Sequence, residues 1–239
     1  MRKPVIDYRK VRLSNITGPE FRHLFYFVGW IVYLQMFAWT ERNIDPLKCW
    51  VAYSPLDSKI PFNEWFIIPY VSWYILMWFA IFYFLLYKVD TFKGMSKYIL
   101  FCQIVAIISY VWFPSRQDLR PAGLWQEHPL HAVSEFPRSN IATWAVKVLY
   151  TTDTNTGVCP SLHVAYSLAV ASAWGKDPTA RKWVKATIWV WVILICISTV
   201  FVKQHSVVDV FAALVMCIFA ELIAFWPYWK KKFRNRFAK

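Results

Sequence analysis

Long runs of apolar residues without a charged side chain constrain this sequence more than any other feature. The segment 65–87 contains 23 residues and no charge, and five other segments, near 24–40, 98–114, 160–174, 182–202 and 206–228, are also strongly apolar. A helix that spans a bilayer needs about 20 predominantly apolar residues, although the shorter segments would also suit helices in a soluble core. The sequence therefore predicts an all-α polytopic membrane bundle of about six transmembrane helices, formed by one domain that covers residues 1–239.

The distribution of charge predicts how this bundle is oriented. Only 17% of the residues are charged, against about 25% in typical soluble domains. If the N-terminus faces the cytoplasm, 19 of the 27 basic residues fall in cytoplasmic segments, where lysine and arginine are enriched. Both termini are thus expected in the cytoplasm, and the net charge of +13 requires no nucleic-acid partner. We expect a multi-pass protein of the cytoplasmic membrane, with an endomembrane as the alternative.

Two long connections are expected on the outer side, at 40–64 and 115–158. Within the second, the segment 141–150 is apolar but too short to span, which predicts a helix lying in the membrane interface. Cys49 and Cys159 would both lie outside, where they could form a disulfide or, as we expect, remain free thiols. The five cysteines show no metal-binding spacing.

Two histidines lie in patterns suited to phosphate chemistry. His205 is followed four residues later by Asp209, so on a helix both share one face and the carboxylate can fix the imidazole tautomer. His163 follows Pro160 and Ser161, where a helix start would offer free N–H groups to an anion beside a possible proton donor. The predicted topology places both histidines on the outer face. A structural His–Asp pair and an interfacial histidine are the alternatives.

Several cationic side chains could hold phosphate oxygens. Arg120 precedes Pro121 in the second outer connection, and Arg116 and Lys203 are further candidates beside Ser161. The alternative is that these side chains are solvated. His128 and His131 suggest a metal site, but no third ligand is evident and we expect solvated loop histidines. For Glu221, deep in the last apolar segment, we expect a lysine partner or a packing role.

These residues resemble the motifs of the type 2 phosphatidic acid phosphatase superfamily, K-x6-R-P, P-S-G-H and S-R-x5-H-x3-D. The matches are Arg120-Pro121, Pro160-Ser161-Leu162-His163, and Ser198-Thr199 with His205 and Asp209. The resemblance implies that His205 forms a phosphohistidine oriented by Asp209, and that His163 protonates the leaving group. It also implies that Arg120 and the Ser161 region bind the phosphoryl oxygens, without metal or cofactor.

Three positions depart from these motifs. Phe113 replaces the lysine, Leu162 the glycine and Thr199 the arginine, so Arg116 and Lys203 would have to compensate. The Ser-Thr and Pro-Ser-Leu-His variants also resemble the inositol phosphorylceramide synthase branch, in which a phospho-headgroup passes to an alcohol.

We therefore expect a lipid-phosphate phosphatase, acting on phosphatidic acid, phosphatidylglycerol phosphate or a polyprenyl pyrophosphate at the outer membrane face. A lipid phosphotransferase that uses the same histidines is the main alternative. A non-catalytic lipid-binding or transport protein is a third hypothesis. The expected partners are a lipid substrate and the bilayer, and the oligomeric state is left open.

Overall fold

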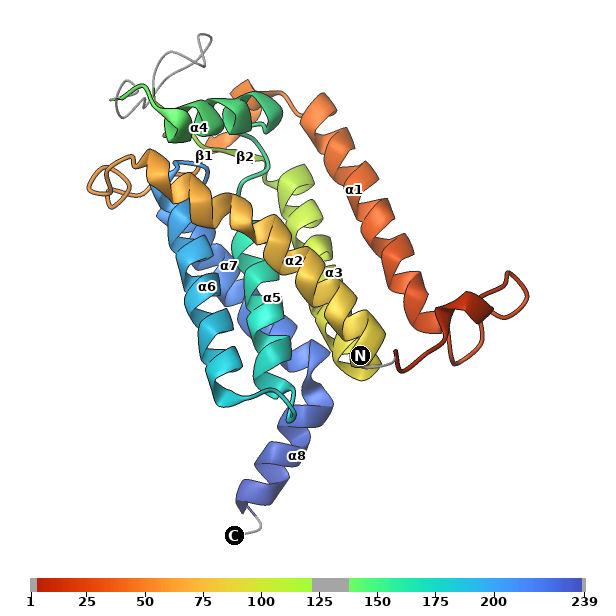
Figure 1. The fold of residues 1–239 in the computed structure, drawn as a ribbon. Coiled ribbons are helices and arrows are strands. Elements are labelled where there is room, and N and C mark those ends of the chain that lie inside the picture. The colour runs from red at the N-terminus through yellow and green to blue at the C-terminus, as the bar shows by residue number, and fades with distance from the viewer. Residues whose placement is uncertain (1–3, 122–137, 238–239) are drawn as a thin grey trace.

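The computed structural model describes residues 4–121 and 138–237, which are predominantly helical (Figure 1). Two very short strands, β1 (Trp50–Val51) and β2 (Ser115–Arg116), pair in parallel and join the two long connections predicted at 40–64 and 115–158. The described helices are α1 (Phe25–Asn43), α2 (Ile67–Tyr87), α3 (Val89–Trp112), α4 (Ile141–Thr152), α5 (Leu162–Lys176), α6 (Lys182–Phe201), α7 (Val207–Ala224) and α8 (Trp226–Phe237).

Four helical segments in the described chain are long and apolar enough to cross a membrane. They are Glu64–Tyr87, which contains α2, together with α3, α6 and α7. Helices α1 and α5 occupy the other two predicted segments, but α5 has only 15 residues. The predicted helical bundle is thus confirmed, whereas the number of spans and their orientation stay predictions.

Helix α5 lies at the centre of the bundle, in contact with α2, α3, α6 and α7. Its buried face carries small side chains, and Ala165, Ala169 and Ala173 are each fully buried. Small residues let helix backbones approach closely in membrane bundles. The start of α5, and therefore His163, is placed among the ends of several other helices.

The predicted segment 98–114 begins too late, because α3 begins at Val89 and residues 89–97 form its first turns. The charged residues there point outward, with Lys93 paired to the exposed Asp90 at 3.0 Å. The opposite face is buried, and Gly94 packs so closely on Phe225 that a Cβ atom would lie 2.5 Å from the ring. Amphipathic packing continues the helix through a segment that charge alone marked as a loop.

The last predicted span, 206–228, is also wrong at its end. Helix α7 stops at Ala224 and α8 begins at Trp226, where Pro227 is tolerated because the first N–H groups of a helix have no internal partner. Glu221 pairs with Lys176 of α5 and accepts a hydrogen bond from Trp229 Nε1 at 2.8 Å. The expected lysine partner of Glu221 is confirmed.

Helix α4 lies across one end of the bundle, and the N-terminal segment and α8 lie toward the other end (Figure 1). The helix predicted at 141–150 is confirmed, since α4 spans Ile141–Thr152. The Tyr150 hydroxyl donates to the Val202 carbonyl and so ties α4 to the end of α6. All five cysteines are free, so the alternative of a disulfide between Cys49 and Cys159 is not realised.

Candidate active site

His205 lies in the tight turn between α6 and α7, at the end of the bundle covered by α4. The backbone N–H groups of Gln204 and His205 both donate to the Thr199 carbonyl, at 3.0 and 3.1 Å. Lys203 has φ of 53°, in the left-handed region that few side-chain-bearing residues adopt. The His205 side chain is thereby held close to the first turn of α7.

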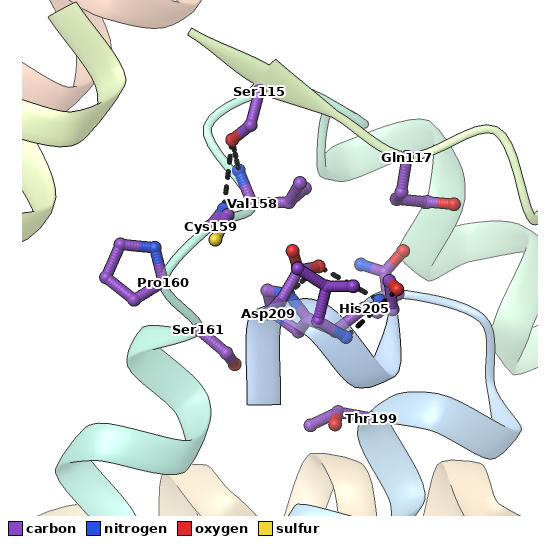
Figure 2. Close-up of polar contacts among 12 residues, drawn as sticks. Ser115, Gln117, Val158, Cys159, Pro160, Ser161, Thr199, His205 and Asp209 are labelled. Carbon is purple, nitrogen blue, oxygen red and sulfur yellow. Dashed lines mark hydrogen bonds and ion pairs between the residues drawn. The ribbon is translucent and has the colours of Figure 1, made fainter. Parts of the chain in front are cut away.

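Asp209 connects this turn to α7. Its Oδ2 atom accepts hydrogen bonds from the Ser206 backbone N–H at 2.9 Å and from His205 Nδ1 at 3.3 Å (Figure 2). Asp209 is completely buried and belongs to a capping box with Ser206. With the Nδ1 proton directed at a carboxylate, Nε2 of His205 is left as the nitrogen available for chemistry. The predicted contact between His205 and Asp209 is confirmed, but the expectation that both lie on one helical face is wrong, because His205 precedes Ser206, the N-cap of α7.

His163 lies opposite, in the first turn of α5. The ring centroids of His163 and His205 are 5.9 Å apart, which confirms that the two histidines meet at the same end of the bundle. The His163 ring contacts Tyr70 and Trp73 of α2, with centroid distances of 4.8 and 4.7 Å. Its Nε2 atom is buried and has no hydrogen-bond partner, so a bound group could satisfy it.

The chain before α5 is anchored to α7 and to β2. Ser161 is the N-cap of α5, rather than Pro160 being its first helical residue, and the Ser161 N–H donates to the Asp209 carbonyl at 3.2 Å. The Ser115 hydroxyl accepts the N–H groups of Val158 and Cys159, at 3.2 and 3.0 Å (Figure 2). These contacts fix the two histidine-bearing segments relative to each other.

Arg120 is buried and directed at the end of α4. Its guanidinium donates to the carbonyls of Tyr150, Asp153 and Thr154, at 3.3, 3.1 and 2.7 Å, and lies 4.5 Å from the centre of the Tyr150 ring. Burial lowers the pKa of the Arg120 guanidinium, while Tyr150 and Asp153 act to raise it. Arg120 thus braces the segment that closes the site, and its role as a phosphate ligand stays a prediction.

The other two candidate cations have different partners. Arg116 donates to the Pro46 carbonyl at 2.9 Å and pairs with Asp118 at 3.3 Å. Lys203 Nζ donates to the carbonyls of Asp57 and Ile60, at 2.9 and 2.6 Å. Burial lowers the pKa of the Lys203 ammonium, against an opposing effect of Asp57. Phosphate binding by Arg116 or Lys203 stays a prediction, and both side chains have structural partners.

A cavity of about 580 Å³ opens beside the two histidines. At its polar end lie His163, His205, Gln204, Asp153 and the threonines 152 and 156. The remainder is lined mainly by aromatic and aliphatic side chains, together with the amide of Gln103; the apolar members include Trp30, Leu34, Phe37, Trp73, Met77, Trp78, Ile81 and Ile99. A long apolar chamber with one polar end suits an amphiphile whose headgroup meets the histidines.

Three residues of this region carry no signal in the motifs. Asp153 and Gln204 both line the cavity, and Asp57 caps α7 through Ser206 and Val207. Gln204 could have been noticed as the neighbour of His205, but Asp57 lies 149 positions before Ser206. Burial raises the pKa of the Asp153 carboxyl, while Arg120 and His205 lower it.

The described residues contain no group of three or more His, Cys, Asp or Glu side chains that could hold a metal ion. His128 and His131, which suggested a metal site in the sequence, lie outside the described residues.

Comparison with protein-family models matches residues 98–233 to the PAP2 superfamily. This segment is more than half of the chain and includes Arg120, His163, His205 and Asp209. Neither the curated proteins nor the solved structures contain a significant match to the chain. On the family match, the chain belongs to the PAP2 superfamily, the type 2 phosphatidic acid phosphatases.

Proposed function

We propose that this chain is an integral membrane phosphatase that hydrolyses a phosphomonoester or pyrophosphate of a lipid through a phosphohistidine on His205. Phosphatidic acid, phosphatidylglycerol phosphate and polyprenyl pyrophosphates are the candidate substrates. The observation that carries the proposal is the buried His205–Asp209 pair facing His163 at the polar end of an apolar cavity. Membership of the PAP2 superfamily supports chemistry on phosphate esters.

In the first step, His205 Nε2 attacks phosphorus and the bond from phosphorus to the lipid oxygen breaks. Asp209 holds the Nδ1 proton and stabilises the positive charge that develops on the ring. His163 gives a proton to the departing oxygen, and the negative charge of the phosphate favours the protonated ring beforehand.

In the second step, water attacks phosphorus and the P–N bond breaks. His163, now neutral, takes a proton from the water, and His205 returns to its starting form as phosphate leaves. The oxygens of the phosphoryl group would be held by the first N–H groups of α5 beside Ser161 and by Arg120, after Arg120 exchanges a backbone carbonyl for phosphate. In both steps every bond formed is matched by a bond broken, and every proton is supplied or taken up by His163 or water.

A lipid phosphotransferase is the second candidate, and the cavity wall favours it. Asp153 and Gln204 lie beside the histidines and offer hydrogen-bond acceptors, and no lysine or arginine is among the described residues that line the cavity. Acceptors suit the hydroxyl groups of an alcohol better than a second phosphate charge. In this mechanism an alcohol replaces water in the second step.

The membrane orientation is part of the proposal. The basic residues favour cytoplasmic termini, which would place the site near α4 at the extracytoplasmic face of the cytoplasmic membrane. Protease accessibility of tags added at each terminus, in sealed right-side-out vesicles, tests this orientation. Cleavage of either tag from outside would contradict it.

The activity is tested with purified wild type, His205→Ala and His23→Gln, supplied with a panel of lipid phosphates in detergent containing chelator. His23 lies near the opposite end of the bundle, where it contacts Tyr8, so it serves as the matched histidine control. Free phosphate released by wild type and His23→Gln but not by His205→Ala would support the phosphatase. A new headgroup-bearing lipid, formed only with an alcohol acceptor, would support the transferase. Lipid binding without turnover would overturn both and leave the non-catalytic lipid-binding hypothesis.

A further inference from the structure

Helix α8 leaves the bundle at the end opposite α4 and the two histidines (Figure 1). The preceding helix, α7, begins beside His205 and has 18 residues. At about 1.5 Å per residue it is about 27 Å long, close to the ~30 Å hydrocarbon core of a bilayer. One non-helical residue, Phe225, with φ of −113° and ψ of 25°, separates α7 from α8. Helix α8 therefore starts where the α7 span reaches the opposite membrane surface.

Only the first turn of α8 is fixed to the bundle. Lys176 Nζ, at the end of α5, lies 4.4 Å from the centre of the Phe225 ring and 5.5 Å from that of Trp229. Trp229 Nε1 also donates to the Glu221 carboxylate of α7 at 2.8 Å. Beyond this turn, residues 230–235 are all exposed. The bundle thus sets where α8 begins, and most of its surface is left for another partner.

The aromatic side chains of α8 form one stripe, which consists of Trp226, Trp229 and Phe233. Their spacing of three and four residues places them on the same helical face. Trp226 is 53% exposed and Phe233 is 44% exposed, so the described part of the chain does not cover the stripe. Tryptophan is enriched where a membrane meets water. The stripe is therefore placed and composed for the boundary between headgroups and acyl chains.

The rest of the α8 surface is basic. The exposed cations of this helix are Lys230, Lys231, Lys232 and Arg234, and the segment 222–239 contains no aspartate or glutamate. Among the residues that the structure describes, no ion pair includes any of these four cations. Lys232 Nζ lies 5.0 Å from the centre of the Trp229 ring, so a cation flanks the aromatic stripe directly. A helix with this division lies in a membrane interface, with its basic side chains among the headgroups.

We propose that α8 binds the surface of an anionic phospholipid leaflet, on the side of the membrane opposite the two histidines. The stripe enters the boundary between headgroups and acyl chains, and the cations contact the anionic headgroups. Each basic side chain near such a surface contributes about fivefold to the binding constant. Nucleic acid or an acidic protein would also attract the cations, but neither provides a membrane interface for Trp226 and Phe233. The inference is independent of the proposed function, because α8 is remote from His205.

The test measures hydrogen–deuterium exchange of the amides of residues 230–235, by mass spectrometry, in the full-length chain. The chain is placed in nanodiscs of phosphatidylcholine alone, or of phosphatidylcholine mixed with phosphatidylserine. These amides lie beyond the contact with the bundle, so they should open readily on a zwitterionic surface. We expect exchange to be about tenfold slower in the discs that contain phosphatidylserine. Salt at about 1 M, where the Debye length is about 3 Å, should remove this difference.

Two changes within α8 separate the effect of charge from the effect of the stripe. The combined variant Lys231→Gln, Lys232→Gln, Arg234→Gln should lose the response to phosphatidylserine, while glutamine keeps nearly the same helix propensity. Phe233→Ser keeps every cation but interrupts the stripe, so its response should be clearly weaker than that of wild type. Both sets of changes lie at exposed positions outside the bundle, so the melting temperature should be unchanged.

The matched control is the combined variant Arg9→Gln, Lys10→Gln, Arg12→Gln. It removes three exposed cations from the N-terminal segment, which lies toward the same end of the bundle, and should leave the exchange of α8 unchanged (Figure 1). Equal exchange of wild type in the two kinds of nanodisc would overturn the inference, as would an equal loss of response in this control. A full response in Phe233→Ser would also overturn it. If polyglutamate or heparin slowed exchange in phosphatidylcholine nanodiscs as much as phosphatidylserine does, the partner of α8 would be a soluble polyanion instead.

Discussion

Asp57 is expected to control the position of the nucleophile, although it lies outside the cavity wall and far from His205 in the sequence. Its Oδ2 atom accepts hydrogen bonds from the Ser206 hydroxyl at 2.6 Å and from the Ser54 N–H at 2.7 Å, and its Oδ1 atom accepts the Val207 N–H at 2.9 Å. The carboxylate is completely buried. It therefore caps the helix whose first turn carries Asp209, directly after His205.

Replacement of Asp57 by alanine leaves three donors without their acceptor. Each buried, unpaired donor costs about 1–3 kcal/mol, and loss of a helix N-cap typically costs about 1 kcal/mol. Since such costs do not simply add for groups in one hydrogen-bond network, we expect destabilisation of about 3 kcal/mol in the variant. A displacement of His205 by about 1 Å would also reduce kcat by about 100-fold.

The assay measures kcat and KM for the preferred lipid, together with the melting temperature, for wild type, Asp57→Ala, Asp57→Asn and Asp45→Asn. Asp57→Asn keeps the shape and one acceptor, so it should lose less of both kcat and stability than alanine. Asp45→Asn should match wild type. The reasoning would be refuted if Asp57→Ala kept wild-type kcat in its folded fraction, because the clamp would then not position His205.

Three further changes have defined outcomes. His163→Gln should slow turnover of a lipid phosphate about 10²- to 10⁴-fold. It should slow turnover of nitrophenyl phosphate much less, because the leaving nitrophenolate needs no proton. Equal losses on both substrates would contradict the role of His163 as a general acid. Glu221→Gln should lower the melting temperature, since it breaks a partly buried pair with Lys176, at a cost between the roughly 1 kcal/mol of an exposed pair and the roughly 3–5 kcal/mol of a buried one; an unchanged melting curve would contradict this. Ile81→Trp should fill the apolar end of the cavity and reduce kcat/KM for long-chain lipids more than for short-chain ones; equal reduction would show that the chain lies elsewhere.

The parts of the molecule that could be predicted from the sequence depend on local chemistry. Apolar length located the helices, and the short spacing of His205 and Asp209 predicted their contact, although His205 lies in the turn before α7 and not on the helix. The start of α3 could not be read in the same way, because Gly94 packs on Phe225 from the far end of the chain. Charge marked that segment as a loop, while tertiary packing made it helical.

The contacts that surround His205 are not local, and for that reason the sequence did not reveal them. Asp57 and Ser206 meet across 149 positions, and Asp153 and Gln204 across 51. Lys203 looked like a phosphate ligand because it is a cation next to His205. Its backbone conformation instead directs the ammonium to the carbonyls of Asp57 and Ile60.

The replacement of the motif arginine by Thr199 removes a positive charge near His205 but leaves the backbone of the turn that carries His205 intact. The Thr199 carbonyl still accepts the N–H groups of Gln204 and His205, so the turn that presents the nucleophile is maintained by the backbone. A positive side chain is nevertheless missing there, and Phe113, where the motif has a lysine, is 66% exposed at the end of α3. Neutral donors and a single buried arginine stabilise one negative charge more readily than two. The two replacements therefore remove positive charge from the motif positions while the backbone of the turn keeps its hydrogen bonds.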